Sequence, residues 1–300
     1  MPAVEISHIT KSFGPVKAVD DVSLTVEKGE FFGLLGPNGA GKTTTIRCML
    51  DIFKPDNGTV SILGGPMNEA KKDRIGYMPE ERGLYQDLQL EKVLTYLASL
   101  KGLTTAETHE RLTDLLHRFD LTEHRRKKVK ELSKGMQQKA QIISTIIHRP
   151  ELLIIDEPFS GLDPVNTQMV KDLLRDLHNS GSTIIMSTHA MHQVEELCDR
   201  ILLINHGKVM LYGRLAEIRR QFSGHALMVR VEGGSLPQIN GVISIEQVNG
   251  GHRLNLAPET SPQEVLRGLV GGGVPVEQFE VAMPTLDEIF IRVVRAEEAA

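Results

Sequence analysis

The sequence predicts an α/β protein with a mostly parallel sheet, an N-terminal antiparallel β subdomain, an inserted helical subdomain and a small C-terminal α+β domain. Short continuous apolar runs, each followed by a turn and a helical stretch, occur at residues 31–35, 152–155 and 183–186. Such runs are typical of parallel strands buried on both faces. Alternating apolar and polar residues at 4–7 and 22–26 precede them and predict antiparallel strands. A block of helical periodicity separates the first two runs and predicts the insertion.

Length and composition limit the class further. The chain has 300 residues, 34 Lys and Arg against 39 Asp and Glu, and 40% apolar residues, which is typical of a globular protein of two domains. Its only cysteines, Cys48 and Cys198, predict buried thiols in a reducing compartment. No apolar run approaches the roughly 20 residues that span a bilayer, and no signal-peptide pattern occurs, so we expect a cytoplasmic chain. The formal charge of −5 gives no global field for nucleic acid, and we expect no such partner.

A phosphate-binding loop follows the first buried strand. The motif G-x-x-x-x-G-K-[ST] is matched by Gly36, Pro37, Asn38, Gly39, Ala40, Gly41, Lys42 and Thr43. Backbone N–H groups, the following helix N-terminus and the Lys42 ammonium would bind nucleotide phosphates. The Thr43 hydroxyl would ligate Mg²⁺, and we include the next residue, Thr44, among the nucleotide-binding residues. The alternative is a glycine-rich turn that matches by chance.

The helical block covers about residues 86–147. Its apolar residues recur at i, i+3, i+4 and i+7, in two stripes formed by Leu90, Val93, Leu94, Leu97 and Leu112, Leu115, Leu116, Phe119. Near its end, Ser133 stands in N-cap position before another helix and is followed by Gly135. This helix start is a second candidate anion site, and an ordinary capped helix is the alternative.

Two carboxylates follow the second buried strand. Asp156 and Glu157 lie at the strand end where ligands of open α/β sheets bind. We expect Asp156 to hold magnesium and Glu157 to polarise the attacking water. Taken alone, the pair fits a solvated strand end equally well, and the phosphate loop favours the functional interpretation.

These motifs resemble the ATP-binding subunits of ABC transporters over residues 4–220. The phosphate loop and the carboxylate pair correspond to Walker A and Walker B, and residues 132–136 correspond to the signature. The resemblance further assigns Asp163 to the D-loop and His189 as the switch histidine. It also places Phe13 where the family stacks an aromatic ring on adenine, although Phe13 alone would be interpreted as a core residue.

The resemblance implies a P-loop NTPase cassette that acts as a homodimer or in a paired cassette. MgATP would bind between Walker A of one cassette and the signature of the other, and hydrolysis would open the pair. Integral membrane permease subunits would be the partners, which places the chain peripherally on the inner face of the cell membrane. The alternatives are a soluble ABC ATPase of translation or DNA repair and a non-hydrolysing regulatory module, and Glu157 and His189 speak against the latter.

Three residues depart from the family pattern. Glu80 stands where the family usually has Gln, and its carboxylate keeps an oxygen for Mg²⁺ but loses an amide donor and adds a charge. We include Glu80 among the metal ligands. Lys134 and Met136 replace Gly and Gln in the signature. Because Ser133 and Gly135 are retained, we expect the contact with the γ-phosphate to survive.

A basic cluster, residues 125–130, precedes the signature. A solvated loop is the simplest interpretation. The functional alternatives are a field that attracts nucleotide phosphates and a contact with the anionic cytoplasmic leaflet.

We place the boundary between a cassette of residues 1–222 and an accessory domain of residues 223–300, with a linker at 223–225. The accessory domain is predicted to have strands at 226–231, 242–248, 252–256 and 276–281 and helices near 262–269 and 285–294. Apolar residues such as Val229, Val231, Ile243 and Ile245 would form its small core, and a contact of these faces with the partner chain is the further expectation. It resembles the C-terminal extension of the ATPase subunits of bacterial drug and sodium exporters, which implies export, and it contains no catalytic constellation.

Overall fold

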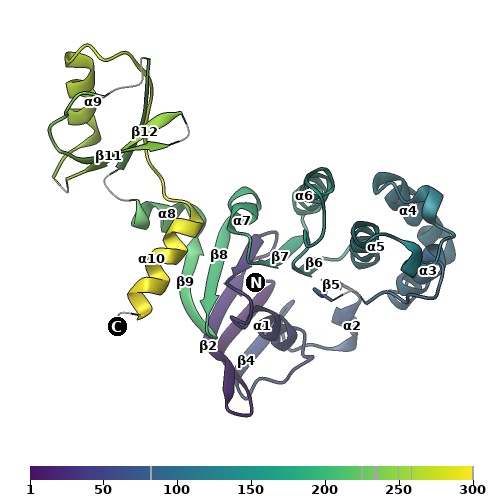
Figure 1. The fold of residues 1–300 in the computed structure, drawn as a ribbon. Coiled ribbons are helices and arrows are strands. Elements are labelled where there is room, and N and C mark those ends of the chain that lie inside the picture. The colour runs from purple at the N-terminus through teal and green to yellow at the C-terminus, as the bar shows by residue number, and fades with distance from the viewer. Residues whose placement is uncertain (82, 224–225, 233–235, 249, 258, 299–300) are drawn as a thin grey trace. The chain divides into compact units, whose positions relative to one another are not determined.

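The computed structural model describes residues 1–300 except 82, 224–225, 233–235, 249, 258 and 299–300. The chain divides into two compact units, Met1–Leu215 and Ala216–Ala300 (Figure 1). This division falls earlier than the predicted boundary between residues 222 and 223, because most of helix α8 (Leu215–Phe222) belongs to the second unit. Two residues of the predicted linker, 224 and 225, lie outside the described residues.

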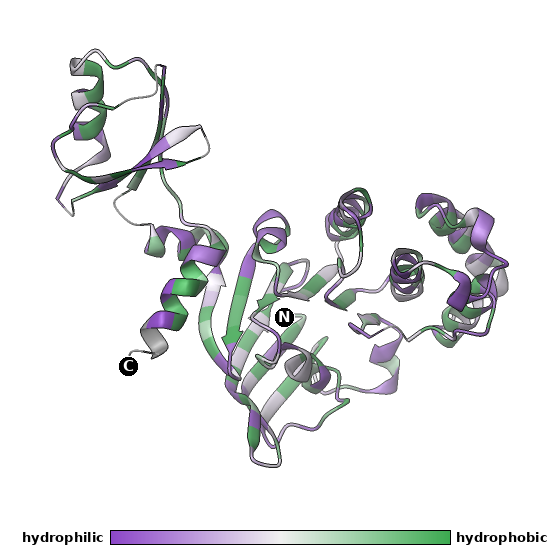
Figure 2. Cartoon of the chain, in the orientation of Figure 1, coloured by the Kyte–Doolittle hydropathy of each residue, from purple (hydrophilic) through white to green (hydrophobic). Residues whose placement is uncertain are grey.

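A six-stranded sheet forms the centre of the first unit, in the order β5-β6-β7-β3-β8-β9. Its strands are parallel except β9, which is antiparallel to β8. They span Phe31–Leu35 (β3), Ile75–Met78 (β5), Leu152–Asp156 (β6), Thr183–Thr188 (β7), Arg200–Asn205 (β8) and Lys208–Arg214 (β9). The three predicted buried runs are thus β3, β6 and β7, which lie side by side and are buried throughout. Figure 2 shows green hydrophobic residues along these strands.

Helices cover both faces of this sheet. Helix α1 (Lys42–Met49) lies on one side, and α6 (Pro164–Asn179) and α7 (Met191–Leu197) lie on the other (Figure 1). The predicted antiparallel subdomain is confirmed as strands β2 (Val16–Val26), β1 (Val4–Phe13) and β4 (Asn57–Ile62), in that order. Apolar side chains of α1 and of both sheets share one core, so the phosphate loop rests on a rigid base.

The helical subdomain is confirmed between β5 and β6, and the short helix α2 (Glu69–Lys72) precedes β5. The helical subdomain contains α3 (Leu90–Leu100), α4 (Thr105–Arg118), two 3₁₀ turns (Thr122–His124 and Val129–Glu131) and α5 (Lys134–Ile146). The predicted stripes face inward, since Leu90, Val93 and Leu94 are fully buried. Across the described residues, none of the helices combines the length and the hydropathy needed to cross a membrane.

The second unit contains a four-stranded antiparallel sheet in the order β11-β12-β10-β13. Its elements agree with the predicted ones: β10 (Ala226–Val231), β11 (Val242–Val248), β12 (Gly251–Leu256), α9 (Pro262–Gly271), β13 (Val276–Val281) and α10 (Leu286–Glu298). The core joins apolar residues of the sheet, including Val229, to Val265 and Leu269 of α9.

The expectation that Ile243 and Ile245 belong to this core is wrong. Their exposed fractions are 69% and 42%. Both lie on β11, an edge strand with a bulge between Val242 and Ser244. Val242 of the same strand packs against the core, so only the outer part of this edge strand faces solvent.

The expectation of buried free thiols is confirmed. Cys48 on α1 is 2% exposed and Cys198 after α7 is 7% exposed, and neither forms a disulfide. Burial raises the pKa of both thiols, which keeps them protonated and unreactive at neutral pH.

Candidate functional site

The phosphate loop joins β3 to α1 and requires glycine at two positions. Gly41 has a φ of +107°, and a Cβ built on it would lie 2.3 Å from the carbonyl oxygen of Ala18. A Cβ on Gly36 would lie 2.2 Å from the carbonyl oxygen of Ile204. A side chain at either position would displace backbone. Helix α1 begins at Lys42 without a side-chain cap, so its first turn presents N–H groups to an anion.

The ammonium of Lys42 is held by oxygen atoms. Its Nζ donates to the carbonyl oxygens of Gly36 at 2.7 Å and Pro37 at 3.1 Å. It lies 4.0 Å from Oε1 of Glu157. Burial lowers the pKa of Lys42, and the neighbouring carboxylates oppose that change. The side chain is therefore fixed over the loop before any phosphate binds.

Both carboxylate oxygens of Asp156 accept hydrogen bonds. The side chain is 1% exposed, and Thr43 Oγ1 donates to its Oδ2 at 2.7 Å. The hydroxyl of Ser187 donates to its Oδ1. Strand β7 lies between β6 and β3, and its Ser187 is in register with Asp156. The sheet thus brings the end of β6 within reach of the first turn of α1.

Glu157 follows β6 in the left-handed region, with a φ of +51°. Such a conformation costs on the order of 1 kcal/mol for a residue with a side chain. Oε1 accepts from the backbone N–H of His189 at 3.0 Å and lies 2.8 Å from the Nδ1 of that histidine. Oε2 accepts from Thr188 Oγ1 at 3.1 Å. These bonds orient the buried carboxylate, while the His189 side chain is 58% exposed.

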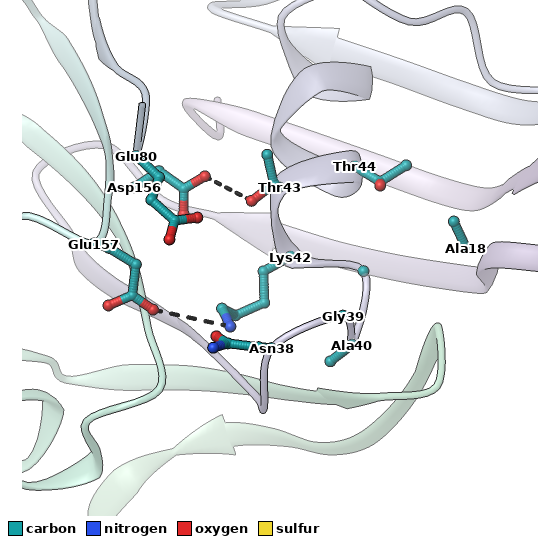
Figure 3. Close-up of a pocket in the computed structure, with 11 residues that line it drawn as sticks. Ala18, Asn38, Gly39, Ala40, Lys42, Thr43, Thr44, Glu80, Asp156 and Glu157 are labelled. Atoms are coloured by element: carbon teal, nitrogen blue, oxygen red, sulfur yellow. Dashed lines mark hydrogen bonds and ion pairs between the residues drawn. The ribbon is translucent and has the colours of Figure 1, made fainter. Parts of the chain in front are cut away.

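These groups surround one cavity of about 380 Å³. Figure 3 shows the Lys42 ammonium near Glu157, and Glu80 beside Asp156 on the opposite side from Thr44 and Ala18. The lining residues are Ala18, Asn38, Gly39, Ala40, Gly41, Lys42, Thr43, Thr44, Glu80, Asp156 and Glu157. The structure therefore collects nearly all residues predicted from Walker A and Walker B, together with Glu80.

Phe13 stands apart from this lining, as do Gly36 and Pro37 at the start of the loop. The Phe13 ring is 46% exposed and packs edge-on against Phe53 at a centroid distance of 5.4 Å. The Lys11 ammonium lies 5.7 Å from the same ring. The interpretation of Phe13 as a core residue is therefore wrong, and its ring is accessible to a ligand.

The residues of the signature and the D-loop also lie outside the cavity. Ser133 caps α5 by accepting from Met136 N at 3.2 Å, as predicted. Asp163 caps α6 by accepting from Asn166 N at 3.0 Å. A Cβ built on Gly135 would meet the Gly161 carbonyl oxygen at 3.6 Å, so the two motifs are neighbours. Within one chain, the signature and D-loop residues therefore do not line the cavity formed by the phosphate loop.

Sequence reasoning missed the residues that position the carboxylates. Ser187 and Thr188 directly precede the predicted switch histidine, and the signal that identifies their role is their place at the end of the central strand β7. Gln141 on α5 was also missed. Its amide donates to the carbonyl oxygens of Pro79 at 2.8 Å and Glu81 at 3.1 Å and thereby holds the segment that carries Glu80.

Comparison with protein families agrees with this geometry. Residues 19–160 match the model described as "ABC transporter". Residues 213–294 match the model "ATP-binding protein DrrA1-3-like, C-terminal domain". The second match falls largely on the second compact unit.

Similarity to individual relatives shows the family of this chain. The chain is 43% identical over 293 residues to the uncharacterized ABC transporter ATP-binding protein YhaQ of Bacillus subtilis, covering 97% of this chain and 98% of the relative. The chain belongs to the ABC transporter ATP-binding proteins. As a member of this family it is an ATPase whose hydrolysis of ATP is coupled to transport.

Two further comparisons bear on this ABC ATPase. The daunorubicin resistance ATP-binding protein DrrA3 of Streptomyces coeruleorubidus is 32% identical over 312 residues, with 99% of each chain covered. A solved structure titled "Structure of ATP binding subunit of ABC transporter" superposes with a TM-score of 0.69 at 34% identity, covering 73% of this chain and 93% of that one. The solved structure thus matches most of this chain in fold, and DrrA3 matches it over nearly its full length.

Proposed function

We propose that this ABC ATPase is the motor subunit of an exporter and hydrolyses MgATP between two cassettes. The observation that carries the proposal is the convergence of Lys42, Thr43, Asp156 and Glu157 on one cavity at the carboxyl ends of β3 and β6. The phosphates would bind to the loop N–H groups and to the Lys42 ammonium. The adenine ring would stack on Phe13.

The oxygen atoms of the cavity fit a magnesium ion. The hydroxyl of Thr43 and the carboxylate of Asp156 already lie within 2.7 Å of each other, and hydroxyl and carboxylate oxygens are the ligands that Mg²⁺ prefers. Thr43 and Asp156 would hold the ion, with Glu80 as a third ligand. When bound, Mg²⁺ neutralises phosphate charge and orients the phosphates for in-line attack.

Glu157 would polarise the attacking water. Its two oxygens accept from His189 and Thr188, so its orientation is set before ATP binds. His189 would contact the γ-phosphate, since its side chain is exposed while its backbone N–H and Nδ1 lie beside Glu157. This arrangement links the hydrolytic carboxylate to the presence of the third phosphate.

The second half of the site would come from another copy or from a paired cassette. Ser133 and Gly135 at the start of α5, and Asp163 at the start of α6, are exposed or partly exposed and face no nucleotide cavity in their own chain. Their helix N-termini suit an anion. ATP bound to one phosphate loop would therefore bridge to the signature of the partner.

Export follows from the relatives and from the second unit. DrrA3 is named for daunorubicin resistance, and a further relative, 33% identical over 298 residues, is named Nod factor export ATP-binding protein I. Both are matched over nearly the whole of this chain, accessory domain included. The partners would be integral membrane permease subunits, which would hold the chain at the inner face of the cell membrane. The accessory domain would modulate the cassette.

An apolar cleft of about 360 Å³ in the first unit would receive the permease. Ile52, Tyr77, Leu97, Leu100 and His148 contribute to its lining. Burial lowers the pKa of His148 to about 4, so the ring is neutral at physiological pH and adds no charge to the cleft. An apolar helix end fits such a lining.

Co-purification with an integral membrane permease of the source organism tests the proposal. We expect the tagged chain to retain that permease in detergent, and we expect Leu100→Glu to reduce the yield about tenfold, because it places a carboxylate among largely apolar lining residues. Leu100 is 59% exposed, so this variant should fold. Val270→Glu, at a 62% exposed site in the second unit, is the control. Failure of the wild-type chain to retain the permease would contradict the proposed partner.

Magnesium dependence tests the ligand role of Glu80. We expect Glu80→Gln to keep most ATPase activity, because the amide presents an oxygen at the same reach. We expect Glu80→Ala to require more Mg²⁺ for half-maximal activity, because the oxygen is gone. The measurement is initial rate against Mg²⁺ concentration at fixed ATP. Equal dependence in the wild type and the alanine variant would exclude Glu80 from the metal site.

A further inference from the structure

Two segments of the helical subdomain lie side by side. Residues 85–96 carry exposed tyrosine and leucine side chains, and residues 125–130 carry exposed basic side chains. Backbone N–H groups of Leu90 and Val129 donate to the carbonyl oxygens of Lys127 and Leu88 at 2.9 and 3.0 Å. A bridge between Gln89 and Lys128 continues this pairing. The ladder therefore fixes residues 125–130 beside the segment that leads into α3, so the basic cluster is an ordered surface.

Part of the cluster is used within the subdomain. Arg125 Nε donates to Glu91 Oε2 at 3.1 Å, and Lys130 Nζ donates to Asp87 Oδ1 at 2.7 Å. These pairs raise the pKa of both basic groups and keep them charged. The middle of the cluster, Arg126–Lys128, is exposed and forms no side-chain ion pair within 4.0 Å among the described residues. Three cations are thus free to meet an external anion.

Exposed tyrosine and leucine side chains lie on the segment that pairs with the cluster. Tyr85, Leu88 and Tyr96 are 52%, 46% and 47% exposed. The two tyrosine rings pack edge-on at a centroid distance of 6.0 Å, which presents them as one surface. Exposed apolar side chains that gather in one place are typical of interaction surfaces. We name Tyr85, Leu88, Tyr96, Arg126, Lys127 and Lys128 the aromatic–basic patch.

The charge of the patch contrasts with that of the chain. Basic residues outnumber acidic residues by six to four in segments 85–96 and 123–131, and two of those acids are the paired Asp87 and Glu91. Glu123 and Glu131 are the other two. The whole chain carries a formal charge of −5. The net positive charge of these segments therefore favours an anionic partner.

We infer that the aromatic–basic patch binds the anionic surface of a lipid bilayer directly, independently of the permease. Tyrosine rings favour the headgroup region because they are amphipathic, and neighbouring Lys and Arg side chains bind anionic headgroups. Free nucleotide would bind the cations through its phosphates, but it would not account for the exposure of Leu88 and the two tyrosines. Tyr96 lies one helical turn from Leu100, so the patch adjoins the apolar cleft that we propose for the permease. That adjacency rests on the proposed function, whereas the patch itself does not.

Vesicle co-sedimentation of the purified full-length chain tests this inference. We expect binding to vesicles that contain about one third phosphatidylglycerol, little binding to pure phosphatidylcholine, and release at high ionic strength. Arg126→Gln/Lys127→Gln/Lys128→Gln should weaken the partition coefficient about a hundredfold, at roughly fivefold for each basic residue. Tyr85→Ser/Tyr96→Ser should weaken it at constant charge.

The control variant removes three exposed lysines elsewhere. Lys28→Gln/Lys54→Gln/Lys208→Gln changes the net charge equally and should bind vesicles like the wild type. ATP affinity of the Arg126–Lys128 variant should equal that of the wild type.

Three outcomes would overturn the inference: equal loss of vesicle binding in both triple variants, weaker ATP binding in the Arg126–Lys128 variant with vesicle binding kept, or binding only to vesicles that contain the permease. Co-purification with the permease can succeed while vesicle binding fails, so the two proposals stand or fall separately.

Discussion

Replacing Glu157 with glutamine should reduce the turnover of ATP by about two orders of magnitude or more while leaving ATP bound. Glutamine keeps the size of the side chain and one oxygen, which can still accept from His189. It loses the negative charge that would polarise water. The first-turn N–H groups and Lys42 are unchanged, so the phosphates retain their ligands. The measurement is steady-state phosphate release together with an equilibrium titration of ATP.

The same variant should accumulate as an ATP-bound dimer, because the nucleotide that joins the two copies is no longer hydrolysed. Size exclusion with and without ATP detects this species. Glu110→Gln, an exposed carboxylate on α4, is the matched control and should behave like the wild type. Unchanged turnover in Glu157→Gln would remove this residue from the mechanism.

Replacing Lys42 with alanine should weaken ATP binding about 10- to 100-fold, because a hydrogen bond from a charged group contributes about 1.5–3 kcal/mol. The ammonium is already held over the loop by the Gly36 and Pro37 carbonyls, so little ordering is needed when phosphate binds. Its removal also deprives Glu157 of the cation at 4.0 Å. Equilibrium titration with ATP measures the loss.

Lys54→Ala provides the control for charge alone. Its side chain is 80% exposed and pairs with Asp51, away from the cavity. We expect its ATP affinity to match that of the wild type. An Lys42→Ala protein with wild-type affinity would show that the phosphates bind elsewhere.

The central part of the site could be predicted from sequence because its signals are local. A buried strand, a glycine-rich loop and a helix follow one another within residues 31–49, so the pattern carries its own context. Asp156 and Glu157 are similarly marked by the strand that ends beside them. The edge at which both motifs meet follows from parallel pairing alone.

The contacts that cross the sheet could not be predicted. Ser187 and Thr188 act on the carboxylates because β7 lies between β6 and β3, and strand order is a tertiary property. Alternation in β11 likewise did not show that the strand lies at an edge, so Ile243 and Ile245 were placed in the core. The local sequence pattern predicts which side chains share one face of a strand, but it does not predict which strands lie beside it.

The most direct test of the composite site is complementation between two inactive variants. Ser133→Arg damages the signature, and Lys42→Ala damages the phosphate loop. A mixed dimer has one intact site, formed by the loop of one chain and the signature of the other, and one doubly damaged site. The measurement is ATPase activity of the mixture against that of each variant alone. A composite site predicts activity above the sum of the two variants. Activity no greater than that sum, in samples where size exclusion shows the mixed dimer, would contradict hydrolysis at a site shared between cassettes.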